Sequence, residues 1–89
     1  MERHGQAKGG KCTPEYQAYL HAKRLCENPH DRKFKYYGGR GIQFFFKSFE
    51  EFFAALGPRP SPKHSLDRFP NGNGHYERGN VRWATAKEQ

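Results

Sequence analysis

The side chains best suited to chemistry lie close together between residues 65 and 85. One carboxylate, Asp67, is followed by the imidazole of His75, the phenol of Tyr76 and the amide of Asn80. A single placed acid in a basic protein is suited to a divalent cation, which would hold a nucleic-acid phosphate and stabilise the negative charge that develops during its hydrolysis. The residue types alone leave an alternative open, in which Asp67 only pairs with a nearby arginine.

Two short strands joined by a turn-forming loop are predicted to position these side chains. The strand patterns are SLDRF and VRWAT, and the loop between them contains the turn sequence PNGNG. Strict alternation along a strand would send Asp67 and Arg68 to opposite faces, so both reach one phosphate only if the strand twists or bulges there. Thr85 and Glu88 form a capping-box pattern, which predicts a helix beginning at Ala86.

A first helix is predicted over residues 14–27. Thr13 is a suitable N-cap, Pro14 fits the first helical turn, and the Asn28-Pro29 pair ends the pattern. The side chains expected on its buried stripe are Tyr16, Tyr19, Leu20, Lys23 and Cys26.

A second, aromatic-rich helix is predicted between Ser48 and Gly57, after a glycine turn and a strand from Ile42 to Phe46. Ser48 begins a capping-box pattern, and Gly57 followed by proline ends the helix. Together the elements predict a small single α+β domain over residues 13–89, preceded by a basic flexible arm over residues 1–12. The expected buried face of the second helix consists of Phe49, Phe52, Phe53 and Leu56.

The charge balance indicates a polyanionic partner. Sixteen Lys and Arg residues against nine Asp and Glu residues give a net charge of +7 among 89 residues, which favours nucleic acid over an anionic membrane surface. The chain has no run of about 18 apolar residues and no apolar block of a signal peptide at its start, so we expect a soluble protein in the cytoplasm.

Two cysteines are too few for a disulfide framework. Reduced thiols are the simpler interpretation, and the alternative is a zinc site. Because zinc takes four N or S ligands, that site would need both cysteines and two histidines, in a spacing that fits no zinc-finger pattern. We therefore expect no structural zinc. The candidate ligands are Cys12, Cys26, His4, His21 and His30.

Several blocks of the sequence, taken together, resemble a known enzyme family. The order SLDR…YERGNVRWATAKEQ, preceded by TPEY, CENP and YYGGRGI, closely resembles the small phage and bacterial HNH (His-Me finger) endonucleases, whose site is a ββα-metal motif. The resemblance runs from Thr13 to Gln89 and depends on the combination of blocks. It implies a metal-dependent DNA endonuclease that uses Mg²⁺ or Mn²⁺, with the ββα-metal core over residues 65–89 and a truncated final helix.

The resemblance assigns roles to the hairpin residues. Asp67 takes the place of the acidic metal ligand, and Arg68 stands where HNH enzymes normally have the general-base histidine. Because arginine stays protonated in proteins, Arg68 is expected to grip a phosphate. A subgroup with the same DR pair, which includes a rare-cutting restriction enzyme, is thought to use a loop tyrosine, and Tyr76 matches it one residue later than in the commonest loop. His75 is the rival base, and water without a protein base is the third alternative.

Two amides complete the site that the resemblance implies. Asn80 matches the asparagine of the HNH name, which pins the loop to the first strand and orients the base; its alternative role is that of a simple turn residue. Gln89 aligns with the second metal ligand, where many relatives carry His or Asn, and an amide oxygen is a weaker ligand. Many relatives also carry cysteines that could complete a zinc site, at places where this chain has Phe44 or Phe45 and Val81. Aromatic packing is therefore expected in place of that zinc site.

Four basic side chains are candidates for phosphate contacts that weaken with salt: Lys35, Arg40, Arg59 and Arg82. One active site cuts one strand, so a monomer would nick DNA and a homodimer would break both strands. Two other functions stay open. One is a DNA-binding module that derives from such a nuclease and lacks catalysis, which Arg68 in the histidine place favours. The other is an RNA-binding accessory protein, which depends on charge and aromatic content alone.

Overall fold

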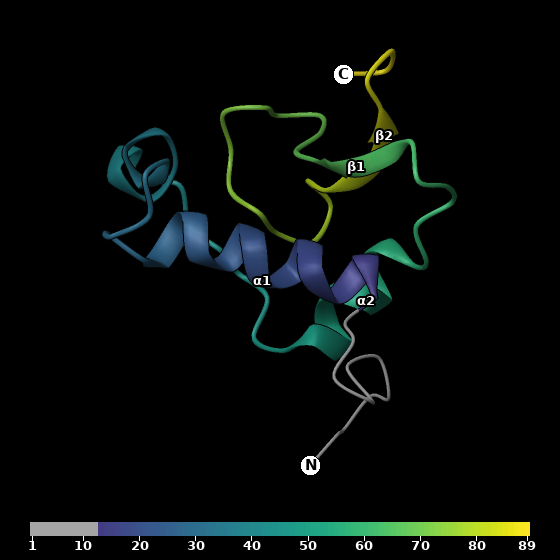
Figure 1. Cartoon of the computed structure of the whole chain (residues 1–89), viewed down its shortest axis with the longest axis horizontal. Helices are drawn as coiled ribbons and strands as arrows, with labels where there is room; N and C mark the ends of the chain where they lie inside the picture. The colour runs from purple at the N-terminus through teal and green to yellow at the C-terminus, as the bar shows by residue number, and fades with distance from the viewer. Residues whose placement is uncertain (1–12) are drawn as a thin grey trace.

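Two α-helices and an antiparallel hairpin form the regular structure of residues 13–89, the part of the chain that the computed structural model describes (Figure 1). The basic arm predicted over residues 1–12 lies outside these residues. The combination of helices with a short antiparallel sheet is the predicted α+β class. In chain order the elements are α1 (Pro14–Glu27), the 3₁₀ turns η2 (Phe34–Tyr36) and η3 (Gly38–Arg40), α2 (Phe49–Leu56), β1 (His64–Asp67) and β2 (Arg82–Thr85).

Both helices begin and end where their capping residues predict. The Thr13 hydroxyl accepts the Tyr16 N–H at 3.2 Å, and the Ser48 hydroxyl accepts the Glu51 N–H at 3.2 Å. Gly57 ends α2 with a φ of +71°, a left-handed value that glycine adopts without the steric cost of a Cβ. These hydrogen bonds satisfy backbone groups that a helix end leaves unpaired.

The predicted buried stripe of α1 is wrong in part. Leu20 is 41% exposed, and Lys23 forms an exposed ion pair with Glu27 at 2.7 Å. Ala22 and Leu25 are buried instead, alongside Tyr19. The helix is therefore rotated so that the small Ala22 faces α2 and the segment between them, because the large rings of that segment need room close to the helix backbone.

The strand predicted from Ile42 to Phe46 does not form a strand. A single parallel bridge joins Phe44 to Tyr76, flanked by hydrogen bonds from the Phe45 N–H to the Tyr76 carbonyl at 2.8 Å and from the Tyr76 N–H to the Gln43 carbonyl at 3.0 Å. The side chains still alternate as in a strand, with Ile42, Phe44 and Phe46 buried. The opposing loop turns away on both sides of Tyr76, so the pairing cannot extend.

Aromatic rings fill the core between α1, residues 42–46 and α2. Phe52 has no exposed surface, and its ring makes edge contacts with Tyr19 at 5.5 Å and Phe46 at 5.4 Å between centroids. Trp83 of β2 also makes an edge contact with Phe52 at 6.3 Å, and its indole N–H donates to the Gly57 carbonyl at 2.9 Å. The hairpin is thus fastened to the core through Trp83, a ring with a satisfied polar edge.

The hairpin pairs β1 with β2 in a register that sets which side chains share a face. Leu66 lies opposite Trp83, and Asp67 lies opposite Arg82. Beyond β2, the Glu88 side chain accepts the Thr85 N–H at 2.9 Å, and the Glu88 N–H reaches the Thr85 hydroxyl at 3.3 Å, so the predicted capping box forms. A turn follows in place of the helix expected from Ala86. None of the helices in residues 13–89 has the length and apolarity needed to cross a lipid bilayer.

Candidate functional site

Asp67 and Arg82 form an ion pair at the end of the hairpin. They face each other as the last residue of β1 and the first of β2, and Arg82 Nε lies 2.9 Å from Asp67 Oδ2. Their side chains are 24% and 29% exposed. The guanidinium of Arg82 also covers the Phe69 ring at 3.8 Å from its centroid and donates to the Glu88 carbonyl at 3.0 Å. The arginine pairing considered for Asp67 is therefore present.

Gln89 reaches the strand that carries Asp67. Its amide nitrogen donates to the Ser65 hydroxyl at 2.9 Å. Ser65 and Asp67 are two residues apart on β1 and thus point to the same face. Because the nitrogen of Gln89 makes this bond, its amide oxygen is the atom left for a cation. A carboxylate and an amide oxygen form a hard donor set that suits Mg²⁺, provided that Arg82 leaves Asp67.

Arg68 makes contacts that Asp67 does not share. Its guanidinium donates to the Gly74 carbonyl at 3.0 Å and lies 5.3 Å from the ring centroids of both Tyr37 and Tyr76. Within residues 13–89, no hydrogen bond or ion pair joins Arg68 or Tyr76 to the Asp67–Arg82 pair. Asp67 and Arg68 therefore contact different groups, as the alternation of side chains along a strand predicted.

Tyr76 is part of the core. Its side chain is 6% exposed, and its ring lies 6.0 Å from Phe44 and 6.5 Å from Tyr37 between centroids. Burial raises the pKa of Tyr76 to about 12, although the nearby Arg68 guanidinium acts in the opposite direction. At neutral pH the phenol stays protonated in this arrangement, so Tyr76 cannot accept a proton without leaving its packing.

His75 has its acceptor nitrogen occupied. The Gln43 backbone N–H donates to His75 Nδ1 at 2.9 Å, so the neutral ring carries its hydrogen on Nε2. The ring also makes an edge contact with Phe45 at 5.0 Å between centroids. Breaking one backbone hydrogen bond would free Nδ1 to accept a proton, a smaller change than the removal of a buried ring.

Asn80 holds the hairpin loop together. It is the single polar residue among the buried ones of the described chain, at 7% exposure. Its side-chain oxygen accepts the Asn71 N–H at 2.9 Å, and its nitrogen donates to the carbonyls of Asn71 at 3.0 Å and His75 at 2.9 Å. The Asn80 carbonyl accepts the Phe69 N–H at 3.2 Å. One amide thus fixes both ends of the loop that carries His75.

A groove of about 720 Å³ separates α1 from the hairpin. Tyr37, Tyr76 and Trp83 line this groove, whereas Asp67 and Arg82 do not. Ser65 lines the groove as well. The predicted tyrosine base therefore lines this groove, whereas the predicted metal ligand does not.

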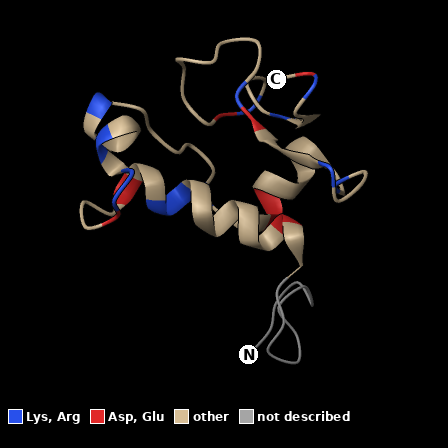
Figure 2. Ribbon diagram, turned by 45° about the horizontal axis from the view of Figure 1, so that its top comes forward, with Lys and Arg blue, Asp and Glu red and all other residues tan. Residues whose placement is uncertain are grey.

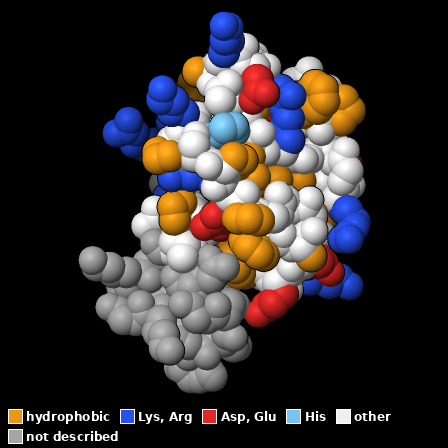
Figure 3. Space-filling view, turned by 90° about the vertical axis from the view of Figure 1, so that its right-hand side faces the viewer, with side chains coloured by type: hydrophobic (Ala, Val, Ile, Leu, Met, Phe, Trp, Pro, Cys, Tyr) orange, Lys and Arg blue, Asp and Glu red, His pale blue; other side chains and the backbone are white. Residues whose placement is uncertain are grey.

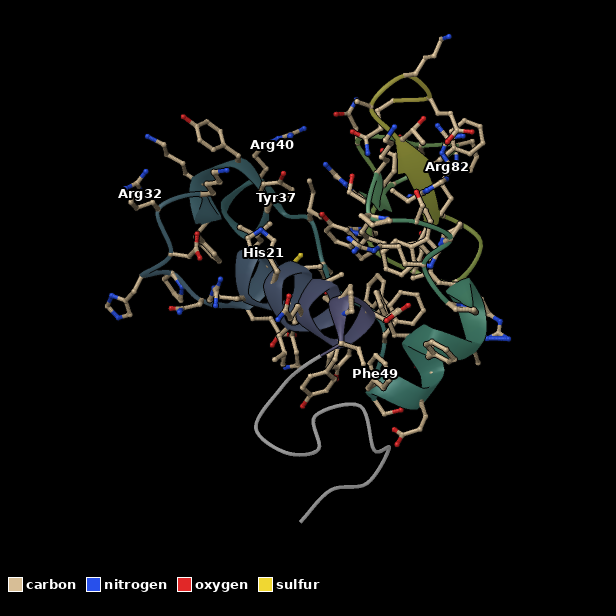
Figure 4. All side chains as sticks on the ribbon, turned by 45° about the vertical axis from the view of Figure 1, so that its right-hand side comes forward. His21, Arg32, Tyr37, Arg40, Phe49 and Arg82 are labelled. Carbon is tan, nitrogen blue, oxygen red and sulfur yellow. The ribbon has the colours of Figure 1, made fainter. Side chains whose placement is uncertain are left out.

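The candidate phosphate contacts are dispersed over the surface. Lys35 lies over the exposed Tyr36 ring at 5.2 Å, and Arg40 donates to the Asn73 side chain at 3.3 Å. Arg59 donates to the His64 carbonyl at 3.3 Å on the other side of the hairpin. Figure 2 shows basic residues on α1, on the segment after it and around the hairpin, and Figure 4 shows Tyr37 and Arg40 on the segment after α1 and Arg82 on β2. Figure 3 shows basic side chains spread over one face, among hydrophobic and acidic ones.

Cys26 is a protonated thiol in a half-buried place. Burial raises its pKa to about 11, against the opposing effect of Arg68. Cys12 and His4, two of the zinc ligands considered from the sequence, lie outside the described residues. Within residues 13–89, no three His, Cys, Asp or Glu side chains gather as a metal-binding group.

Sequence reasoning missed three residues that contact the candidate site. Phe69 lies beneath Arg82, Ser65 binds Gln89, and Tyr37 stacks beside Tyr76. The sequence could have indicated Ser65, because a residue two positions before Asp67 on a strand lies on the same face. Comparisons of the chain with protein-family models, with curated proteins and with solved structures gave no match. The resemblance to HNH endonucleases stays a prediction from the residue pattern.

Proposed function

We propose that this protein is a metal-dependent DNA endonuclease that hydrolyses a phosphodiester bond at the outer face of the hairpin. The observation that carries the proposal is the 2.9 Å hydrogen bond between Gln89 and Ser65. It brings the amide of the expected second ligand to the face of β1 that holds Asp67, although the two residues are far apart in sequence. The net charge of +7 supports a DNA substrate, which a cytoplasmic enzyme would meet.

Asp67 and Gln89 would hold the divalent cation through oxygen atoms. The cation, Mg²⁺ or Mn²⁺, would neutralise the charge that develops on the phosphate during hydrolysis. Arg82 occupies Asp67 Oδ2 at 2.9 Å in the free protein and would turn to the phosphate when DNA binds. A planar guanidinium binds carboxylate and phosphate with the same geometry, so this exchange requires no new kind of contact.

His75 is the better candidate base in this fold. Tyr76 would have to leave the core, and its pKa is about 12. His75 needs only to release the Gln43 N–H from Nδ1. Asn80, which binds the His75 carbonyl at 2.9 Å, would then hold the imidazole in place while it accepts the proton of the attacking water.

The proposal is tested by nicking of supercoiled plasmid in Mg²⁺ or Mn²⁺. Asp31 is a matched control for Asp67, because it also pairs with an arginine, Arg24, at 3.0 Å and lies away from the hairpin. Wild type and Asp31→Asn should nick the plasmid, whereas Asp67→Asn and wild type in EDTA should leave it intact. Equal nicking by wild type and Asp67→Asn contradicts the proposal.

The same assay assigns the base. His75→Ala should reduce the nicking rate by about 10²-fold or more, the typical contribution of a general base. Tyr76→Phe, which keeps the buried ring, should leave the rate within a few-fold of wild type. The opposite order of effects would return the base role to Tyr76.

A second candidate function is DNA binding without hydrolysis. The Asp67–Arg82 ion pair and the occupied His75 Nδ1 favour it, because both describe a site with no free ligand or base. In that case wild type and Asp67→Asn would retard DNA equally on a gel, and neither would nick it under any metal condition.

A further inference from the structure

Exposed aromatic rings lie beside basic or imidazole groups in the described structure. Tyr36 is 55% exposed, Phe45 is 48% exposed and Phe69 is 49% exposed. Single exposed apolar residues are common on protein surfaces and need no explanation. These three rings differ because each contacts a basic or imidazole side chain. The pairs are Lys35 with Tyr36 at 5.2 Å, His75 with Phe45 at 5.0 Å and Arg82 with Phe69 at 3.8 Å.

The three aromatic residues are each linked to one loop, the segment 70–75 of the hairpin, by a ring contact, by the chain itself or by hydrogen bonds of Arg40. Phe69 directly precedes this loop in the chain, and its N–H donates to the Asn80 carbonyl at 3.2 Å. Arg40 connects the loop to the Tyr36 side, because it donates to the Asn73 side chain and to the Tyr36 carbonyl, each at 3.3 Å.

Phe45 borders the loop at its other end. Its ring meets that of His75, and the His75 carbonyl accepts a hydrogen bond from Asn80 at 2.9 Å. The amide that pins the loop therefore also fixes the residue that Phe45 contacts. We call the whole set the loop-flanking surface: Tyr36, Phe45 and Phe69 with Lys35, Arg40, His75 and Arg82.

We propose that the loop-flanking surface binds unpaired DNA bases, so that the preferred substrate has a single-stranded segment beside the cleaved bond. In a duplex the flat faces of the bases are covered by their neighbours, and only unpaired bases can stack on a protein ring. Aromatic rings among basic side chains are the usual means of binding single strands, because the rings take the bases and the cations take the phosphates.

Phe69 connects this surface to the proposed nuclease site. Arg82, which covers the Phe69 ring, is also the partner of Asp67 at 2.9 Å. A base stacked on the free side of Phe69 would place its phosphate within reach of Arg82. The position of the cut relative to the unpaired base thus rests on the proposed function, whereas base binding itself does not.

The test is fluorescence anisotropy in EDTA with oligothymidine and with a duplex of equal length. Wild type should bind oligothymidine more tightly than the duplex. Phe69→Ala and Tyr36→Ala should each weaken oligothymidine binding by about tenfold, the loss expected for one stacked base, and change duplex binding by less than about twofold. Leu20→Ala is the matched control, since Leu20 is an exposed apolar residue of α1 at 41%.

Phe69→Leu is the control for a folding defect, because leucine keeps the apolar bulk of the side chain without an aromatic face. It should weaken oligothymidine binding as Phe69→Ala does while the thermal midpoint stays at the wild-type value. Equal affinity of wild type for oligothymidine and duplex overturns the proposal, as does an equal loss for both ligands in Phe69→Ala. Tighter binding of oligouridine than of oligothymidine overturns the choice of DNA.

A cleavage measurement separates this proposal from the proposed function. In Mg²⁺, a duplex with a single-stranded gap should be cut faster than the intact duplex, and Phe69→Leu should reduce that ratio towards one. If no DNA is cut, the nuclease proposal fails, and the anisotropy result in EDTA still decides whether the loop-flanking surface binds unpaired bases.

Discussion

Phe52 and Asn80 are the most deeply placed residues of two regions that are held together in different ways. Around Phe52, rings from α1 and from residues 42–46 pack edge to face, and the Phe49 ring of α2 packs at a tilt of 34°. Around Asn80, three side-chain hydrogen bonds from one amide hold the loop. The aromatic region shares its stability among many contacts, whereas in the loop region one residue makes three of the side-chain hydrogen bonds. The chemistry of the candidate site therefore lies in the part that a single substitution can loosen.

The largest expected effect comes from the aromatic region. Phe52→Ala should lower the free energy of unfolding by about 4 kcal/mol, because it removes a fully buried ring and leaves a cavity among other rings. Urea denaturation measures the loss, with Phe45→Ala as control, since Phe45 is 48% exposed and should lose less than about 1 kcal/mol. Similar losses for the two variants would mean that the core lies elsewhere.

Asn80→Ala should cost about 2 kcal/mol and act locally, because its three hydrogen bonds lie within the loop. Hydrogen exchange at the Asn71 amide should become fast, while the amides of α1 keep their protection. Asn73→Ala is the control, because Asn73 is an exposed amide of the same loop. Uniform loss of protection over both regions would show that the loop and the aromatic core unfold together.

The same contrast explains how much of the structure the sequence predicted. Thr13, Ser48 and Gly57 mark helix ends through contacts with their own neighbours in the chain. The local sequence is therefore enough to predict where these helices begin and end. The strand over residues 42–46 was wrong because a strand needs a partner, and Tyr76 offers one bridge. The buried face of α1 was wrong at Leu20 because the prediction followed the stripe of larger side chains along the helix, whereas the packed rings needed the small Ala22.

For the candidate site, the sequence supplied residue types but not their partners. The antiparallel register opposite Asp67 follows once the two strands are paired, and it puts Arg82 there. The occupation of His75 Nδ1 by the Gln43 N–H, and the burial of Tyr76 against Tyr37, depend on how distant segments meet. No periodicity or spacing in one sequence encodes such contacts, and they decide which side chain is free to accept a proton.

Alkaline pH should weaken the contact between the two regions through Tyr76, which packs against Phe44 of the aromatic core. Its pKa rises from the ordinary value of 10.0 to about 12 on folding. Below both values the phenol is neutral in both states; above about pH 10 the unfolded chain releases its proton first, so stability falls as pH rises. The expected loss is about 1 kcal/mol by roughly pH 11.

Tyr76→Phe isolates this effect. The variant should lose the part of the decline above about pH 10. The decline that remains should belong to Cys26, whose pKa rises on folding from 9.0 to about 11, and to Tyr19 and Lys23, whose pKa values folding also raises. Urea denaturation as a function of pH measures both. An unchanged pH profile in Tyr76→Phe would show that the phenol is as accessible to water in the folded chain as in the unfolded one.

The smallest expected effect is that of the Asp67–Arg82 pair. A double-mutant cycle of Asp67→Asn and Arg82→Met should give a coupling free energy of about 0.5–1 kcal/mol, because both side chains are about a quarter exposed and water screens them. The cycle removes the separate contacts of Arg82 with Phe69 and Glu88 from the comparison. The Asp31–Arg24 pair, at 3.0 Å, provides a reference cycle away from the site.

A coupling this small has a consequence for the proposed site. If the pair contributes less than about 1 kcal/mol, Arg82 can leave Asp67 for a phosphate at little cost to the fold, and a cation can take its place on the carboxylate. A coupling above about 3 kcal/mol would mark a buried structural pair, and a cation would then have to compete with the fold itself. The coupling free energy thus distinguishes two kinds of hairpin end. A large value indicates a rigid structure like the aromatic region, and a small value indicates a structure that a ligand can rearrange, like the loop.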